Sequence, residues 1–173
     1  MSVARLTVTA RLAALVALVA LVQVSLVAPL RIFGVAPDVV LLVAVAAGVA
    51  AGPERGAISG FVVGIAYDLF LQTPLGLTAL VCALASYGTG LFQLPLVSHP
   101  RSWQAGCVVV ASGLGVLGFL VIGVVLGQDE LLGVPVLRVA TVVALVNGVL
   151  ALPAVRLLSW VWAPLAPPQR VVL

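Results

Sequence analysis

The 173-residue chain contains no lysine and few charges of either sign. Its eight basic residues are all arginines, and five residues are acidic. Charged residues make up 8% of the chain and hydrophobic residues 64%, whereas soluble domains average about 25% and about 45–50%. A soluble fold of this size would lack the polar residues needed to cover its surface. The composition therefore predicts an integral membrane protein with no separate soluble domain.

Other scarcities exclude several kinds of site. The arginines are scattered along the chain, which argues against a nucleic-acid patch. One histidine, His99, and two separated cysteines, Cys82 and Cys107, cannot supply a zinc site, and a disulfide is not expected. No nucleophile elbow or phosphate-binding loop is present. We therefore expect no catalytic residues, no metal, no cofactor and no nucleic-acid partner.

Long apolar runs separated by short polar breaks predict an all-α fold, a polytopic bundle of six transmembrane helices. The basic lead at 1–11 resembles a signal peptide, but the apolar run after it is too long for one, so we expect the first helix to be retained. Pro53-Glu54-Arg55 is expected to form a tight turn. A single membrane domain, 1–173, then contains helices at about 12–30, 38–52, 56–71, 75–93, 104–127 and 136–162, and a short tail at 163–173.

The arginines also predict the orientation of the bundle. With a cytoplasmic N-terminus, six arginines fall in cytoplasmic segments, and only Arg31 and Arg138 fall outside. Cytoplasmic loops usually carry this excess, so both termini are expected in the cytoplasm. Asp38, at the start of the second helix, and Asp68, near the end of the third, then share the outer third of the bundle with these two arginines.

Glycine recurs at every fourth residue from position 52 into the third predicted helix, and the next step of four reaches an acid: Gly52, Gly56, Gly60, Gly64 and Asp68. Positions four apart lie on one helix face, and small residues on a face let membrane helices approach closely. The fourth predicted helix has small residues at the same spacing: Thr78, Cys82, Ser86 and Gly90. We expect the glycine face to pack within the subunit. Contact with a partner's helix is the alternative.

An acid inside a membrane bundle is costly unless it is paired or hydrated. We expect Asp68 to face the interior and to be satisfied by Arg138, by Arg31 or by a helix N-terminus. A polar ligand site is the alternative to this structural role. A proton-coupled transporter that uses Asp68 is a third hypothesis.

The motifs from residue 37 to residue 76 form an ordered set: Pro37-Asp38, Gly52-Pro53, Gly56, Gly60-Phe61, Gly64, Asp68 and Pro74-Leu75-Gly76. This set resembles the rod shape-determining protein MreD family. In that family a Pro-Asp pair starts the second helix, a glycine run ends in aspartate, and a Pro-Leu-Gly turn follows. Length, helix count and topology fit along nearly the whole chain.

The resemblance implies a non-catalytic scaffold or regulatory subunit of the bacterial cell-elongation complex, in the cytoplasmic (inner) membrane, that supports cell shape and lateral peptidoglycan synthesis. The implied partners are an MreC-like single-span membrane protein, the RodA glycosyltransferase and a class B penicillin-binding protein, with cytoskeletal MreB reached indirectly. Within this hypothesis, six residues are candidates for structural importance or partner contact: Asp38, Gly56, Gly60, Gly64, Asp68 and Arg138.

The MreD fold is also thought to resemble the substrate-binding subunits of energy-coupling-factor vitamin transporters. Such a protein would bind a vitamin near the outer face, where Asp68 and Arg138 are expected. The aromatic content of 6% leaves few side chains to line a vitamin pocket, and several are interfacial tryptophans. The transporter subunit is therefore the second functional hypothesis.

Overall fold

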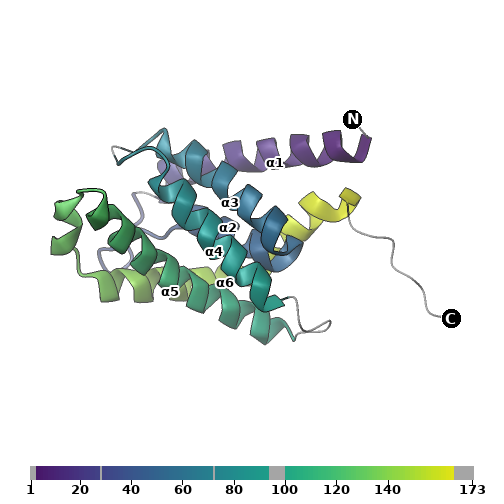
Figure 1. Ribbon diagram of the computed structural model, residues 1–173. Coiled ribbons are helices and arrows are strands. Elements are labelled where there is room, and N and C mark those ends of the chain that lie inside the picture. The colour runs from purple at the N-terminus through teal and green to yellow at the C-terminus, as the bar shows by residue number, and fades with distance from the viewer. Residues whose placement is uncertain (1–2, 28, 72, 94–99, 166–173) are drawn as a thin grey trace.

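The computed structural model describes residues 3–27, 29–71, 73–93 and 100–165, and in these ranges it contains six α-helices and no β-strand (Figure 1). The all-helical bundle predicted from the sequence is confirmed. His99 and residues 166–173 of the predicted tail lie outside the described ranges. The α-helices are α1 (Val3–Val22), α2 (Val39–Ala51), α3 (Pro53–Asp68), α4 (Leu77–Gln93), α5 (Arg101–Val125) and α6 (Val136–Trp162). Three short helical turns extend or connect them: η1 (Gln23–Val27), η2 (Asp129–Gly133) and η3 (Ala163–Leu165).

The six helices fall into two length classes. Three helical stretches, 3–27, 101–125 and 136–165, are long and apolar enough to cross a membrane. In contrast, α2, α3 and α4 contain 13, 16 and 17 residues. At 1.5 Å per residue they are about 20, 24 and 26 Å long, less than the hydrocarbon thickness of about 30 Å. The bundle therefore combines three helices of spanning length with three shorter ones.

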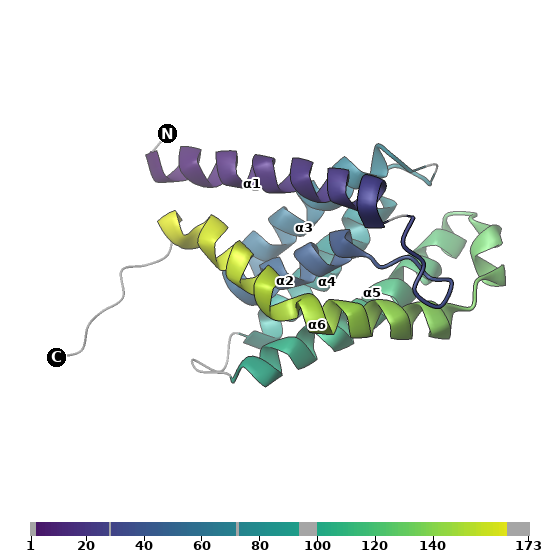
Figure 2. The ribbon, with the colours of Figure 1, turned by 180° about the vertical axis from the view of Figure 1, so that it is seen from behind.

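The shortest helix, α2, forms the centre of the bundle (Figure 2). Every residue from Val40 to Gly48 is buried. A helix that is apolar on all sides is expected to be enclosed on all sides, and α3, α4, α5 and α6 all pack against it. The hydrophobic core is built around α2, with Val63 of α3 and Val108 of α5 among the residues that cover it.

The start of α1 and the end of α6 lie at the same end of the bundle (Figure 2). Arg11 donates a hydrogen bond of 2.7 Å to the carbonyl of Trp160, and its guanidinium lies 4.0 Å from the centre of that indole ring. Arg55, in the first turn of α3, donates to the carbonyl of Leu165 at 3.3 Å and lies over the ring of Trp162. Arginines from separate segments thus gather at one end, while the side of the membrane that this end faces stays a prediction.

The connection between α2 and α3 differs from the prediction. Pro53-Glu54-Arg55 is the first turn of α3 and not a connecting turn. Gly52 alone reverses the chain, with a φ of 82° that disfavours residues with side chains. Proline suits the first helical position because its missing N–H would have no partner there.

Other helix ends also differ from the predicted positions. The first helix begins at Val3 and not near residue 12, so it includes the basic segment before the apolar run. Within this segment the hydroxyls of Thr7 and Thr9 donate hydrogen bonds to backbone carbonyls one turn earlier. The helix α5 begins at Arg101 rather than 104, and α6 has the predicted bounds. The third helix ends at Asp68 rather than 71, where the Asp68 carboxylate turns to the next helix.

Candidate functional site

The glycine face of α3 packs directly against the backbone of its neighbours. A Cβ atom added at Gly64 would lie 2.5 Å from Cα of Ala79, and one added at Gly60 would lie 2.6 Å from the carbonyl oxygen of Cys82. Both contacts are with α4. On Gly56 the same atom would lie 2.6 Å from Cα of Gly48 in α2. These three glycines therefore set how closely α3 approaches α4 and α2.

Small residues of α4 line the other side of this contact. Gly90 lies against the backbone of Pro53, and Ser86 is fully buried and donates a hydrogen bond of 2.6 Å to the carbonyl of Ala44 in α2. The two small-residue faces seen in the sequence thus meet each other, and we call this contact the α3–α4 seam. Gly52, the first glycine of the repeat, has a different role: its backbone lies next to Gly90, but a Cβ atom added on it would meet no atom within 4 Å, and its positive φ forms the turn.

Asp68 lies at the end of the seam and satisfies the N-terminus of α4. Its side chain is 1% exposed. Its carboxylate accepts hydrogen bonds from the backbone N–H groups of Gly76 at 2.8 Å, Thr78 at 3.2 Å and Ala79 at 3.3 Å. The first N–H groups of a helix have no partner inside it and carry a partial positive charge, so a carboxylate is stabilised there. Of the three partners considered for Asp68, the structure shows the helix N-terminus.

Asp38 has the same role at the start of α2. It is the N-cap, and its side chain accepts a hydrogen bond of 2.8 Å from the N–H of Leu41. Gln23, the first residue of η1, accepts from the N–H of Val39 at 2.8 Å and donates to the carbonyl of Pro37 at 3.1 Å. Two polar side chains from different segments therefore complete the buried N-terminus of α2.

The two outer arginines do not pair with these acids. Arg31 and Arg138 are exposed, and in the part of the chain that the structure describes no ion pair links either of them to Asp38 or Asp68. Arg138 instead lies beside the loop before α2, where a Cβ atom added at Gly34 would be 3.6 Å from its guanidinium. The four charges therefore do not pair with one another as predicted. The two acids cap helices, and the two arginines lie at the surface.

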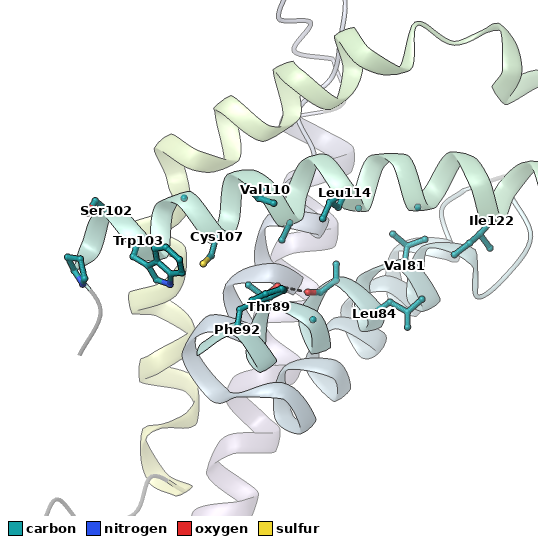
Figure 3. Close-up of a pocket in the computed structure, with 17 residues that line it drawn as sticks. Val81, Leu84, Thr89, Phe92, Ser102, Trp103, Cys107, Val110, Leu114 and Ile122 are labelled. Carbon is teal, nitrogen blue, oxygen red and sulfur yellow. Dashed lines mark hydrogen bonds between the residues drawn. The ribbon is translucent and has the colours of Figure 1, made fainter. Parts of the chain in front are cut away.

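A groove of about 750 Å³ lies between α4 and α5 (Figure 3). Its labelled walls are mostly apolar: Val81, Leu84 and Phe92 on α4, and Trp103, Val110, Leu114 and Ile122 on α5. Gly88, Gly106 and Gly118 also line it, and a Cβ atom added at any of these would meet no atom within 4 Å. We call this feature the α4–α5 groove.

The α4–α5 groove is a feature that the sequence alone did not reveal. The fifth predicted helix, 104–127, contains six glycines, and they follow no single helical face. They are Gly106, Gly113, Gly115, Gly118, Gly123 and Gly127. Leu84, Phe92 and Leu114 are also more than half exposed, as lipid-facing residues are. A sequence pattern cannot separate a hollowed apolar surface from a flat one, because the hollow depends on how two helices diverge.

Comparison with known proteins identifies the family. A family model described as rod shape-determining protein MreD matches residues 5–161. Neither the curated proteins nor the solved structures contain a match to the chain. The matched range runs from the first turns of α1 to the last turn of α6 and includes both capping acids, the α3–α4 seam and the α4–α5 groove. Because this match covers nearly the whole bundle, the chain belongs to the rod shape-determining protein MreD family of bacterial membrane proteins, which acts in cell-shape determination.

Proposed function

We propose that this protein is a scaffold or regulatory subunit of the cell-elongation complex in the bacterial cytoplasmic membrane, and that its α4–α5 groove receives the transmembrane helix of an MreC-like single-span protein. Membership of the MreD family supports the first part. The groove is the single structural observation that supports the second part. The protein then acts by holding partners together, without a catalytic step of its own.

The dimensions of the α4–α5 groove suit a helix. Trp103 and Ile122, which both line it, are separated by about 28 Å along an ideal helix, close to the hydrocarbon thickness of about 30 Å. The glycines on its walls leave room for another backbone, and close backbone approach is what drives association of helices in lipid. The groove therefore offers one transmembrane helix a contact over most of its length.

The proposed role extends to the enzymes of wall synthesis through this partner. An MreC-like protein bound in the membrane would connect the subunit to RodA, to a class B penicillin-binding protein and, indirectly, to MreB.

The structure offers less support for a vitamin-transporter subunit. The pocket nearest Asp38 measures about 250 Å³, whereas pockets for drug-sized ligands usually measure about 300–1,000 Å³.

Filling the α4–α5 groove tests the proposal. Gly106→Phe and Gly118→Phe place a large side chain at positions that line the open groove and where an added Cβ atom meets no atom within 4 Å, so the bundle should fold. We expect each variant to reduce co-purification of the MreC-like partner from membranes and to give rounded cells. Val149→Phe is the matched control, because Val149 is 82% exposed on α6 and does not line the groove. Full partner recovery with both glycine variants would place the partner elsewhere.

The native cysteines offer a second test that leaves the sequence unchanged. Cys107 lines the groove and is partly exposed, whereas Cys82 is buried at 1% exposure. A photoreactive maleimide on Cys107 should form a cross-link with the MreC-like partner in membranes. Cross-linking to lipid alone would show that the groove holds acyl chains, and would contradict the proposed docking site.

A further inference from the structure

A second, smaller pocket of about 250 Å³ lies between the helices at the end where the acids cap α2 and α4, and it is partly open. Its lining comes from α2, α3, α4, α5 and α6, and from the segments next to them. Asp38 is the only charged residue in this lining. Tyr67, Thr78 and Cys82 are the other side chains that carry a polar atom, and the rest of the wall is apolar. This pocket, which we call the Asp38 pocket, adjoins the lipid-facing α4–α5 groove, with which it shares Val81 and Gly115.

One polar group of the Asp38 pocket has no partner, and a second, Asp38, carries a charge that its capping role does not require. The hydroxyl of Thr78 is buried and has no hydrogen-bond partner, although the residue is only 6% exposed. A buried hydroxyl without a partner costs about 1–3 kcal/mol. The Asp38 carboxylate caps α2 by accepting from backbone N–H groups of its first turn, Leu41 among them, yet among the described residues no basic side chain neutralises it. Capping alone needs an oxygen atom and not a charge, since asparagine and serine cap helices as well.

We propose that the Asp38 pocket binds a small ammonium cation, with the Asp38 carboxylate as counter-ion and the Thr78 hydroxyl as a hydrogen-bond acceptor. An ammonium group donates up to three hydrogen bonds, and Asp38 and Thr78 line the same pocket. A cation next to a carboxylate in a poorly hydrated site lowers the cost of burying that charge. This inference does not depend on the proposed binding of an MreC-like partner.

The walls of the pocket favour an organic ammonium ion over a metal ion. Phe119 and Tyr67 line it, and aromatic rings attract organic cations through their electron-rich faces. A transition-metal ion would instead need several His, Cys, Asp or Glu ligands, and the described residues contain no group of three such side chains. The volume corresponds to roughly eight water-sized groups. A short alkylammonium ion therefore fits.

The experiment uses the full chain in detergent and the probe ethylammonium chloride, exchanged for sodium chloride at constant ionic strength. Binding to the folded state raises the midpoint of thermal unfolding as the ligand concentration increases. We expect this rise with ethylammonium, a smaller rise with tetramethylammonium, which cannot donate hydrogen bonds, and none with neutral ethanol. Equal midpoints in ethylammonium and sodium at every concentration would overturn the proposal.

Two substitutions separate binding from folding. Asp38→Asn keeps an oxygen to cap α2 but removes the charge, and it should weaken ethylammonium binding about tenfold or more, as loss of one partner of a buried charge pair does. Thr78→Val keeps the side-chain shape and should weaken binding about three- to tenfold, as expected for one hydrogen bond. Asp129→Asn is the matched control, because Asp129 is an exposed acid in η2 away from the pocket. An unchanged response in Asp38→Asn would overturn the site.

Thr78→Val also distinguishes a ligand site from an isolated packing defect. In sodium chloride it should raise the unfolding midpoint slightly, because it removes a buried hydroxyl without a partner. If that stabilisation comes with an unaltered ethylammonium response, the hydroxyl has no part in binding and the proposal fails.

The same ammonium chemistry could come from a free amine or from a lipid headgroup. Bilayers of phosphatidylglycerol alone and bilayers that also contain phosphatidylethanolamine distinguish these sources. If the headgroup occupies the pocket, phosphatidylethanolamine should abolish the response to ethylammonium in the native chain. If the ligand is a free amine, the response should persist in both bilayers. Either result supports an ammonium site, and no response in either bilayer overturns it.

Discussion

Glycine has opposite environments on the two sides of α4. In the α3–α4 seam, a side chain on Gly60 or Gly64 would collide with the backbone of α4. Across the α4–α5 groove, a side chain on Gly106 or Gly118 would meet no atom within 4 Å. The comparison shows that glycines of similar appearance in the sequence act differently. Those of the seam hold the bundle together, and those of the groove leave a surface open.

Polar groups follow the same division. The seam ends in Asp68, which is buried and accepts three backbone hydrogen bonds, and it contains Ser86, which bonds to α2. The groove is mostly apolar, and the one hydrogen bond drawn in it joins Thr89 to the carbonyl of Ala85 within α4. The seam is therefore specified by direct contacts, whereas the groove presents a surface that another apolar molecule can cover. Four substitutions, taken in order of expected effect, test this contrast.

Gly64→Leu should have the largest effect. The new side chain has no space next to Ala79, so α3 and α4 must separate, and we expect a loss of about 3 kcal/mol or more in the free energy of unfolding. The yield of folded protein in detergent and its unfolding midpoint measure this loss. Gly118→Leu is the matched control and should fold normally. Equal stability of the two variants would show that the seam is not tightly packed.

Asp68→Ala should be the next most destabilising change. It leaves the N–H groups of Gly76, Thr78 and Ala79 without their acceptor, which we expect to cost about 2–3 kcal/mol. Asp68→Asn retains one acceptor oxygen and should cost less. Hydrogen exchange at the start of α4 provides the local readout. If both variants matched the native protein in stability and exchange, the cap would contribute nothing.

Ser86→Ala should have a smaller effect. It removes the hydrogen bond to Ala44 across the centre of the bundle, and interhelical hydrogen bonds in membranes contribute about 0.6–1 kcal/mol. Because Ala44 lies within α2, its carbonyl can also accept the backbone hydrogen bond of the helix, so the substitution does not leave it without a partner. The unfolding midpoint should decrease modestly while the helical content stays the same. A loss as large as that of Asp68→Ala would contradict this ranking.

Gly118→Ala should have the smallest effect and the opposite sign. The added methyl group meets no neighbour, and alanine favours the helix over glycine by about 0.5–1 kcal/mol. We therefore expect slight stabilisation of the isolated protein, whereas Gly64→Ala should destabilise it. A decrease in the unfolding midpoint for Gly118→Ala would show that the groove is closed in the folded protein.

Much of the fold could be predicted because composition and spacing act locally. A chain with 8% charged residues must place its helices in lipid, and runs near 20 apolar residues mark the long spans. Helix ends were less predictable. Pro53 was expected in a turn because proline usually interrupts helices, yet it occupies the first position of α3, where proline is tolerated.

The candidate site was predictable in its parts and not in its arrangement. The spacing of four places Gly56, Gly60, Gly64 and Asp68 on one face of α3, and it also includes Gly52, which the structure assigns to a turn. Attraction of opposite charges suggested that Asp68 would pair with an arginine. The buried N-terminus of α4 provides three N–H donors instead, and the arginines remain at the surface, where hydration stabilises them.

By itself, the sequence determined the membrane class, the six helices, the faces that small residues share and the motif that resembles the MreD family. Only the tertiary structure decided that the α3 and α4 faces meet each other, that Asp68 caps α4, and that α4 and α5 diverge to leave a groove. The physical reason is that a helical period sets which side chains lie together on one helix. Which neighbour covers them depends on contacts between segments far apart in the chain, and no local spacing records those contacts.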